Sequence, residues 1–272
     1  MQKTLPMLAL AVLLTAGSTT AVVAAEVENT FTRELPLSSD GALVVSNRNG
    51  SITVQSWDSA RVQLTCRKVV TAESEQKGRE WLDKINVEIL QDSPDRIEVR
   101  TVRPEDEGWG MFSFLFGERP TSRVDYRLTV PRGARLWLSS VNGSLEVLDP
   151  AGQVIAETVN GSVRIAGAAA PVQAETVNGQ VDLELATGID EPLPGIWLAR
   201  LGSVNGPVTI RLPAGISAHV TASTLNGGIR SDHSLPVVRD LVGATAEGDI
   251  GGGGAEITLE TLNGSIRILA AN

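Results

Sequence analysis

The sequence ETVNGSVRI (Glu157–Ile165) returns almost unchanged as ETVNGQVDL (Glu175–Leu183) and ETLNGSIRI (Glu260–Ile268). Each copy has Asn-Gly at its centre, and the chain contains seven such pairs. Their asparagines are Asn49, Asn142, Asn160, Asn178, Asn205, Asn226 and Asn263. Repetition of this kind indicates one structural unit that is stacked many times along the chain.

The spacing of the pairs predicts how the units follow one another. From Asn142 the steps are 18, 18, 27 and 21 residues, and the last step is 37 residues long. This long step contains ATAEGDI (Ala244–Ile250), in which Glu247-Gly248 replaces Asn-Gly. We interpret it as a degenerate copy, which predicts a series of units without a break.

Residues on both sides of each Asn-Gly alternate with a period of two. Before the pair, inward positions are small or apolar, as at Val154, Ala156 and Thr158. After it, Val163 and Ile165 continue the alternation. This pattern is typical of half-buried strands, so one strand enters each turn and a second strand leaves it.

Two folds fit these strands. Asn-Gly alone favours an antiparallel hairpin, because both residues tolerate positive φ. Pro and Gly recur between units, as in DPAG (Asp149–Gly152) and LPAG (Leu212–Gly215), which gives each unit a second corner. The prediction is therefore an all-β parallel β-solenoid of about six to seven short coils with one short helix; the alternative is an antiparallel β-sandwich of Asn-Gly hairpins. In the solenoid, the Asn residues would form a turn ladder, and the Ser/Thr hydroxyls just inside it would meet backbone groups.

The start of the chain predicts export. Lys3, the apolar run Leu5–Leu14 and the small residues that follow are typical of a secretory signal peptide spanning residues 1–25. The apolar run is too short to span a bilayer comfortably. We expect a periplasmic or extracellular protein.

Composition argues against several kinds of function. Loss of the leader removes Lys3 and takes the formal net charge from −9 to −10, which disfavours nucleic acid and anionic membranes as partners. Cys66, the sole cysteine, lies in an alternating strand and is expected to be a packed strand residue. The two histidines, His219 and His233, lack the spacing of a metal site. No cofactor or metal is predicted.

The chain divides into two regions that we expect to form one continuous body. Residues 26–134 hold one early repeat, further strands and a helix over about 73–85 that contains a weakening Gly78. Residues 135–272 hold the remaining repeats. The helix is expected to cover an open end of the sheet stack.

The aromatic loop, residues 108–120, is the first candidate contact surface. It concentrates Trp109, Met111, Phe112, Phe114 and Phe116. These side chains either pack over the end or flank of the repeats or form an exposed apolar patch that binds a partner. We hypothesise that the loop is the main interaction site.

The residue just before each Asn from Asn142 onward is the second candidate surface. These residues are Val141, Val159, Val177, Val204, Leu225 and Leu262. Simple alternation directs them outward, whereas turn geometry can rotate them inward, and we expect buried corner packing. An exposed row would instead form an apolar stripe suited to a peptide or the ring face of a glycan.

Acidic residues on the repeats are the candidates for catalysis or cation binding. Glu157 and Glu175 hold equivalent positions and would stack, while Asp182 and Glu184 share one outer face. Parallel β-helices host polysaccharide lyases and hydrolases, and stacked carboxylates could share a cation. A solvated outer face is the expected arrangement.

The segments LVVSNRNGSITVQSW and PRGARLWLSSVNGSLEV, with the serial VNG turns, resemble the putative adhesin family, exported bacterial β-strand-repeat proteins that carry a domain of unknown function. The resemblance spans Phe31 to Ile268, implies the fold, and brings no catalytic residues. We predict a non-enzymatic binding or scaffold protein of the cell envelope. Its partner would be an unknown envelope protein or a glycan, and oligomers could form through the aromatic loop or the solenoid ends. The alternatives are a carbohydrate-active enzyme on the same scaffold and an envelope-stress or signalling accessory protein.

Overall fold

The computed structural model describes residues 24–103, 120–187, 197–239 and 241–271. These residues form two large mixed β-sheets, neither of them closed, and one short helix, α1 (Glu75–Leu82). The prediction of an all-β fold with a short helix is confirmed.

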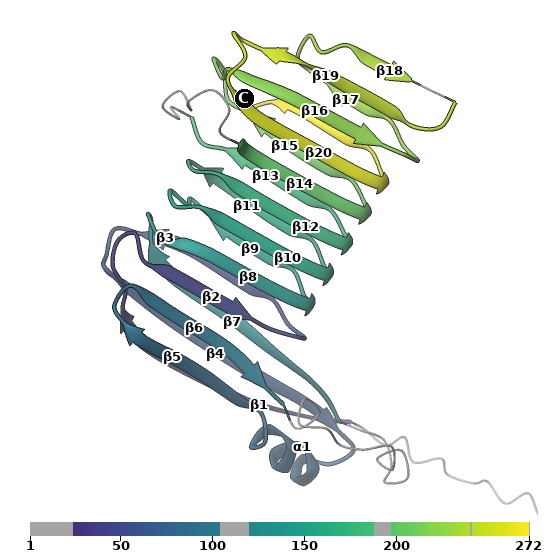
Figure 1. The fold of residues 1–272 in the computed structure, drawn as a ribbon. Helices are drawn as coiled ribbons and strands as arrows, with labels where there is room; N and C mark the ends of the chain where they lie inside the picture. The colour runs from purple at the N-terminus through teal and green to yellow at the C-terminus, as the bar shows by residue number, and fades with distance from the viewer. Residues whose placement is uncertain (1–23, 104–119, 188–196, 240, 272) are drawn as a thin grey trace, which may run out of the picture.

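The strands of each sheet follow one another along an elongated stack (Figure 1). The ten-stranded sheet has the order β1 (Ala25–Pro36), β4 (Arg61–Ala72), β7 (Thr121–Pro131), β3 (Ile52–Trp57), β9 (Leu145–Leu148), β11 (Val163–Ala168), β13 (Val181–Leu185), β15 (Val208–Leu212), β21 (Ile266–Ala270) and β17 (Ile229–Ser231). The eleven-stranded sheet has the order β18 (Val237–Arg239), β19 (Ala244–Ile250), β16 (Ala218–Thr224), β20 (Ala255–Asn263), β14 (Trp197–Asn205), β12 (Val172–Asn178), β10 (Val154–Asn160), β8 (Arg135–Asn142), β2 (Ala42–Ser46), β6 (Arg96–Val102) and β5 (Asn86–Ser93).

The two strands that flank each Asn-Gly lie in different sheets. β10 belongs to the eleven-stranded sheet and β11, which follows the turn, to the ten-stranded sheet. Successive repeats pair in parallel and in register, with Val154 opposite Val172 and Asn160 opposite Asn178. We call each repeat in this stack a rung. The Asn-Gly pairs therefore carry the chain from one sheet to the other and do not close antiparallel hairpins.

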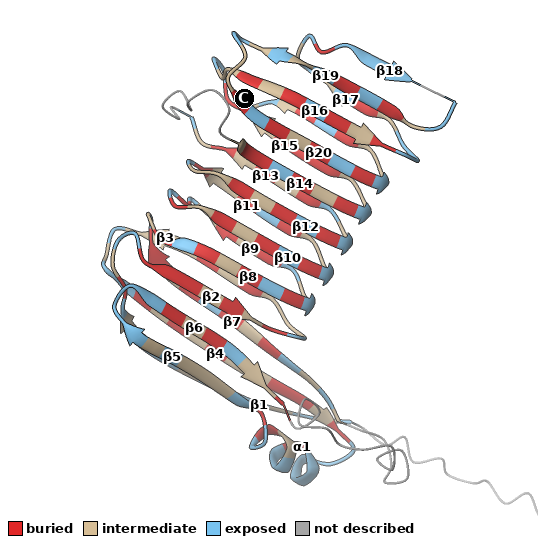
Figure 2. Cartoon of the chain, in the orientation of Figure 1, coloured by how far each residue is buried: buried red, intermediate tan, exposed pale blue. Residues whose placement is uncertain are grey.

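The apolar core lies between the two sheets (Figure 2). In β10, Val154 and Ala156 are fully buried, whereas Glu157 between the inward positions is exposed. Val163 and Ile165 meet the core from β11. Period-two alternation thus places one side of every repeat strand inside.

The last repeat does not extend the stack, because its two strands lie between strands of the two preceding repeats. β20 lies between β14 and β16, and β21 lies between β15 and β17. The expectation of a spatially unbroken series is therefore wrong. Ala244–Ile250 is also not a degenerate turn, because it forms strand β19, antiparallel to β16, with Glu247 and Gly248 in its middle. Chain order and stacking order differ at this end of the molecule.

Glycines allow the chain to return from β19 to β20. Gly251, Gly253 and Gly254 all have positive φ, at 66°, 74° and 140°. A Cβ on Gly251 would lie 2.8 Å from the hydroxyl oxygen of Ser217, just ahead of β16. The glycine run, residues 251–254, therefore passes close over the start of β16, which places β20 on the far side of that strand.

The N-terminal region continues the same two sheets. β2 pairs in parallel with β8, and β3 pairs in parallel with β9, so the early repeat stacks directly on the later ones. The helix is shorter than predicted, because it begins after the N-cap Ser74 and ends at Leu82. Gly78 packs against Val27 and Ala72, and a Cβ there would lie 2.8 Å from Val27 Cγ2. A glycine is needed at this position for the helix to approach β1 and β4 at this end of the stack.

Candidate binding face of the eleven-stranded sheet

The seven asparagines form one continuous ladder at the corner of the stack. Each side-chain amide from Asn142 onward donates a hydrogen bond of 2.8 Å to the side-chain oxygen of its neighbour. The order is Asn49, Asn142, Asn160, Asn178, Asn205, Asn263, Asn226. The ladder follows the stacking order, with the last repeat between the two before it.

Buried hydroxyl groups tie each repeat to its neighbour just inside the ladder. Thr176 Oγ1 donates to the Gly161 carbonyl at 2.8 Å, and Ser203 Oγ donates to the Gly179 carbonyl at 2.9 Å. Ser140 is the exception, since its buried hydroxyl has no partner and the Gly50 carbonyl accepts from another side chain at 3.1 Å, Asn47 Nδ2. The Gly50 carbonyl is therefore satisfied from within its own repeat, and no hydroxyl bond of this kind ties that repeat to the next one.

The Asn-Gly glycines are needed for close stacking. A Cβ on Gly179 would lie 2.0 Å from the Gly161 carbonyl oxygen, and one on Gly206 would lie 1.9 Å from the Gly179 oxygen. Among the seven, Gly50 alone has positive φ, at 121°. Our explanation of the Asn-Gly pairs by tolerance of positive φ is thus wrong for the other six pairs. In these pairs the glycine is needed because it has no side chain.

The residues before the asparagines form an exposed apolar stripe along the outer face. The stripe consists of Val141, Val159, Val177, Val204, Leu262 and Leu225, which are 38–47 % exposed. The expectation of buried corner packing is wrong. In β10 the strand continues through Asn160, so alternation persists to the turn and leaves Thr158 inward and Val159 outward.

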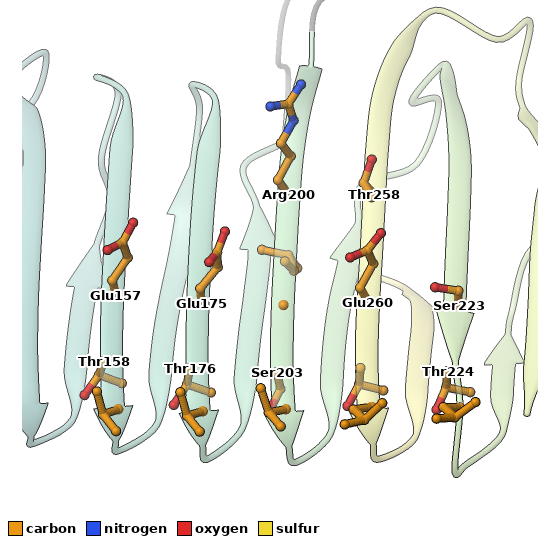
Figure 3. A pocket seen from close by; sticks show the side chains of 18 of the residues that line it. Glu157, Thr158, Glu175, Thr176, Arg200, Ser203, Ser223, Thr224, Thr258 and Glu260 are labelled. Carbon is orange, nitrogen blue, oxygen red and sulfur yellow. The ribbon is translucent and has the colours of Figure 1, made fainter.

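An acidic row runs beside the stripe on the same face. Glu157 and Glu175 are opposite each other in register, and Gly202 separates Glu175 from Glu260. The three carboxylates are exposed, and their side chains lie on the same face of the sheet (Figure 3). Gln173 Nε2 donates to Glu175 Oε1 at 2.9 Å.

The acidic row and the stripe, except for Val141, line a shallow groove of about 1250 Å³. The groove crosses seven strands, from β8 to β19, and its lining also includes Val242, which precedes β19. Arg200 supplies the one basic side chain among its described lining residues and contacts the Trp197 ring, with 5.2 Å from Cζ to the ring centroid. No aromatic side chain lines the groove within the described ranges.

The other residues singled out in the sequence lie away from this groove. Cys66 is buried, and burial raises the pKa of its thiol to about 12, which fits a packed strand residue. Asp182 forms an ion pair with Arg211 on the ten-stranded sheet. His219 Nδ1 lies 2.7 Å from Asp249 Oδ1, between β16 and β19.

The aromatic residues Trp109, Met111, Phe112, Phe114 and Phe116 lie outside the described residues, so the hypothesis about their loop stays a prediction. Within the part of the chain that the structure describes, no three His, Cys, Asp or Glu residues gather as a metal site would require. No described helix has the length and hydropathy needed to cross a membrane.

No protein-family model and no curated protein matches the chain. Among solved structures, it is similar to a putative cell adhesion protein from Clostridium sporogenes, with 12% identity, a TM-score of 0.43, and coverage of 89% of this chain and 100% of that one. A putative adhesin from Bacteroides fragilis has 12% identity, a TM-score of 0.41, and coverage of 89% and 97%. A putative lipid binding protein from Parabacteroides distasonis has 12% identity, a TM-score of 0.25, and coverage of 90% and 97%. Likenesses at this level carry no argument about function.

Proposed function

We propose that this protein is an exported, non-enzymatic binding protein of the cell envelope, and that the outer face of the eleven-stranded sheet is its binding surface. The observation that carries the proposal is the stripe, a row of six exposed apolar side chains, five of which line one groove. Contiguous exposed apolar residues with a polar border mark interaction sites more often than single exposed ones do. The leader-like residues 1–25 support export.

The scaffold under the groove suits a binding role because it fixes the stripe without help from a ligand. Side-chain amides at the corner, hydroxyl bonds just inside it on every strand from β10 to β16, and parallel pairing between neighbouring strands from β8 to β16 hold the surface. A rigid surface loses little conformational entropy when a partner binds. We describe this scaffold as a β-solenoid of the putative adhesin type, supported by the in-register parallel rungs and the serial VNG turns.

The competing proposal, a carbohydrate-active enzyme, has weaker support. Glycosidases divide the roles of acid and base between two carboxyl groups whose surroundings differ. Glu157 and Glu175 occupy equivalent positions on adjacent rungs, and both are exposed. Gln173 donates a hydrogen bond to Glu175, and Ile155 at the equivalent position cannot do so for Glu157. Neither carboxylate, however, is buried as a general acid with a raised pKa would be.

Affinity capture from an envelope extract tests the binding role. A variant with Val159, Val177 and Val204 changed to Thr keeps the β-branched shape but makes the stripe polar. The control changes Val237 and Val238 to Thr, which are also exposed but lie outside the groove. We expect the wild type and the control to retain the same partner and the stripe variant to lose it.

Retention of every partner by a folded stripe variant would contradict the proposal and make the aromatic loop the next surface to test. Cleavage of an envelope polysaccharide by the wild type, abolished by Glu157→Gln or Glu175→Gln, would replace it with the enzymatic alternative.

A further inference from the structure

We propose that the occupant of this groove is a basic amphipathic α-helix of a partner protein, lying along the stripe and perpendicular to the strands. The inference rests on the proposed function and adds the chemistry of the partner. It depends on three properties of the groove, namely its charge, its satisfied backbone and its length.

Charge selects a cationic partner. Glu157, Glu175 and Glu260 line the groove beside the stripe, whereas Arg200 is the one basic residue among the described lining residues. On the other side of the stripe, the asparagine ladder is neutral and polar. A helix with an apolar face and Lys or Arg along one border would be complementary to this surface. Its apolar face would contact the stripe, and its ammonium or guanidinium groups would contact the carboxylates.

Backbone hydrogen bonding favours a helix over an extended peptide. Every strand beneath the middle of the groove, from β10 to β16, pairs with a neighbour on each side. A peptide laid over this face cannot join the sheet, and an extended one would bring unpaired amides onto apolar side chains. A helix satisfies its own amides, which is the condition of helix-in-groove recognition.

The repeat of the groove is close to the pitch of a helix. Neighbouring stripe residues are one rung apart, roughly 4.8 Å, and one helical turn rises about 5.4 Å. A helix along the stripe therefore offers nearly one apolar side chain per rung. The seven strands span about 29 Å at this spacing, a length that about 19 helical residues cover.

The same features disfavour two other occupants. A second copy of this chain would bring three more carboxylates to a face that already carries Glu157, Glu175 and Glu260, so the two surfaces would have like charge and not complementary charge. A glycan would find no aromatic ring among the described lining residues on which to stack.

Fluorescence anisotropy with a synthetic peptide of about 19 residues tests the inference directly. The peptide carries Leu at helical spacing, Lys along one border of the Leu face and Gln along the other, and a second peptide contains the same residues in scrambled order. We expect the amphipathic peptide to bind the wild-type protein and to gain helical circular dichroism on binding. The scrambled peptide should bind at least roughly tenfold more weakly, because it has no continuous apolar face.

Two charge-matched variants locate the site. Changing Glu157, Glu175 and Glu260 to Gln should weaken binding roughly tenfold and reduce its dependence on salt. Changing Glu34, Glu146 and Glu184 to Gln removes the same charge from the ten-stranded sheet and should leave affinity unchanged. Equal losses in both variants, or equal binding of both peptides, would show diffuse electrostatic attraction and overturn the inference.

Absence of peptide binding to the wild type would also overturn it. The broader proposal would survive that result if an envelope partner were still captured by the wild type and lost by the stripe variant. If the captured partner is displaced by the amphipathic peptide and not by the scrambled one, both proposals are supported.

Discussion

At the scale of single residues, the rungs can stack closely because the glycines of the Asn-Gly pairs have no Cβ methyl group. We predict that Gly179→Ala lowers the free energy of unfolding by about 3 kcal/mol or more, because the new Cβ would lie 2.0 Å from the Gly161 carbonyl oxygen. Gly228→Ala is the control, since no heavy atom lies within 4 Å of a Cβ built there. Chemical denaturation of both variants measures the difference. Equal stabilities would contradict the close-stacking explanation.

The buried hydroxyl row gives a second prediction at this scale. Thr176→Val keeps the shape of the side chain but leaves the Gly161 carbonyl without its hydroxyl donor, so we expect a loss of about 1 kcal/mol. Ser140→Ala removes a buried hydroxyl that has no partner, and it should leave stability unchanged or raise it slightly. Thermal unfolding compares the two variants. A larger loss for Ser140→Ala than for Thr176→Val would contradict this account.

Some residue-level features could be predicted from the sequence and others could not. Period-two alternation placed Thr158 inward, and it also directed Val159 outward, although we expected the turn to bury it. The role of the glycines could not be predicted, because the carbonyl that excludes a Cβ belongs to another repeat. The groove could not be predicted either, because its lining combines residues of six repeats with Val242, which belongs to no repeat.

At the scale of elements, β19 is attached to β16 by antiparallel pairing and by a titratable contact. The hydrogen bond to Asp249 raises the pKa of His219 above its ordinary value of 6.5, although desolvation partly opposes it. Protonated His219 is therefore favoured in the folded state. Its contribution to stability is fully present below pH 6.5 and is lost as the pH rises through the raised folded-state pKa.

We predict a corresponding pH dependence of His219→Gln. Wild type should be more stable than the variant below pH 6.5, and the difference should shrink as the pH rises above that value. Thermal unfolding of both proteins across this range measures the difference. A difference that grows with rising pH would have the wrong sign for the contact.

Strand positions were predictable from the sequence because each strand carries its own alternation. The order of the strands was not fully predictable. The near copies at residues 157–165, 175–183 and 260–268 show that these repeats are alike, but likeness alone does not determine which repeats are neighbours. Glu247-Gly248 resembled a turn in sequence and lies in the middle of a strand.

At the scale of the whole molecule, the inserted last repeat makes the C-terminal end depend on residues far along the chain. We predict that a chain ending at Arg239 loses amide protection throughout residues 218–231, because β16 loses both β19 and β20, and β17 loses β21. Protection in β8, β10 and β12 should remain. Hydrogen exchange read by mass spectrometry measures this. Unchanged protection of residues 218–231 would contradict the insertion of the last repeat, because it would require β16 to pair directly with β14.

The binding proposals depend on the stripe being continuous and exposed across this insertion, and disulfide formation in double-cysteine variants tests that arrangement most directly. In the Val204→Cys/Leu262→Cys variant the cysteines lie on adjacent rungs, roughly 4.8 Å apart along the stack, within disulfide range. In the Val204→Cys/Leu225→Cys variant they lie two rungs apart, roughly 9.6 Å, which is too far. We predict that mild oxidation crosslinks the first pair and leaves the second reduced. Rapid crosslinking of the second pair and none of the first would contradict the strand order and the stripe built on it.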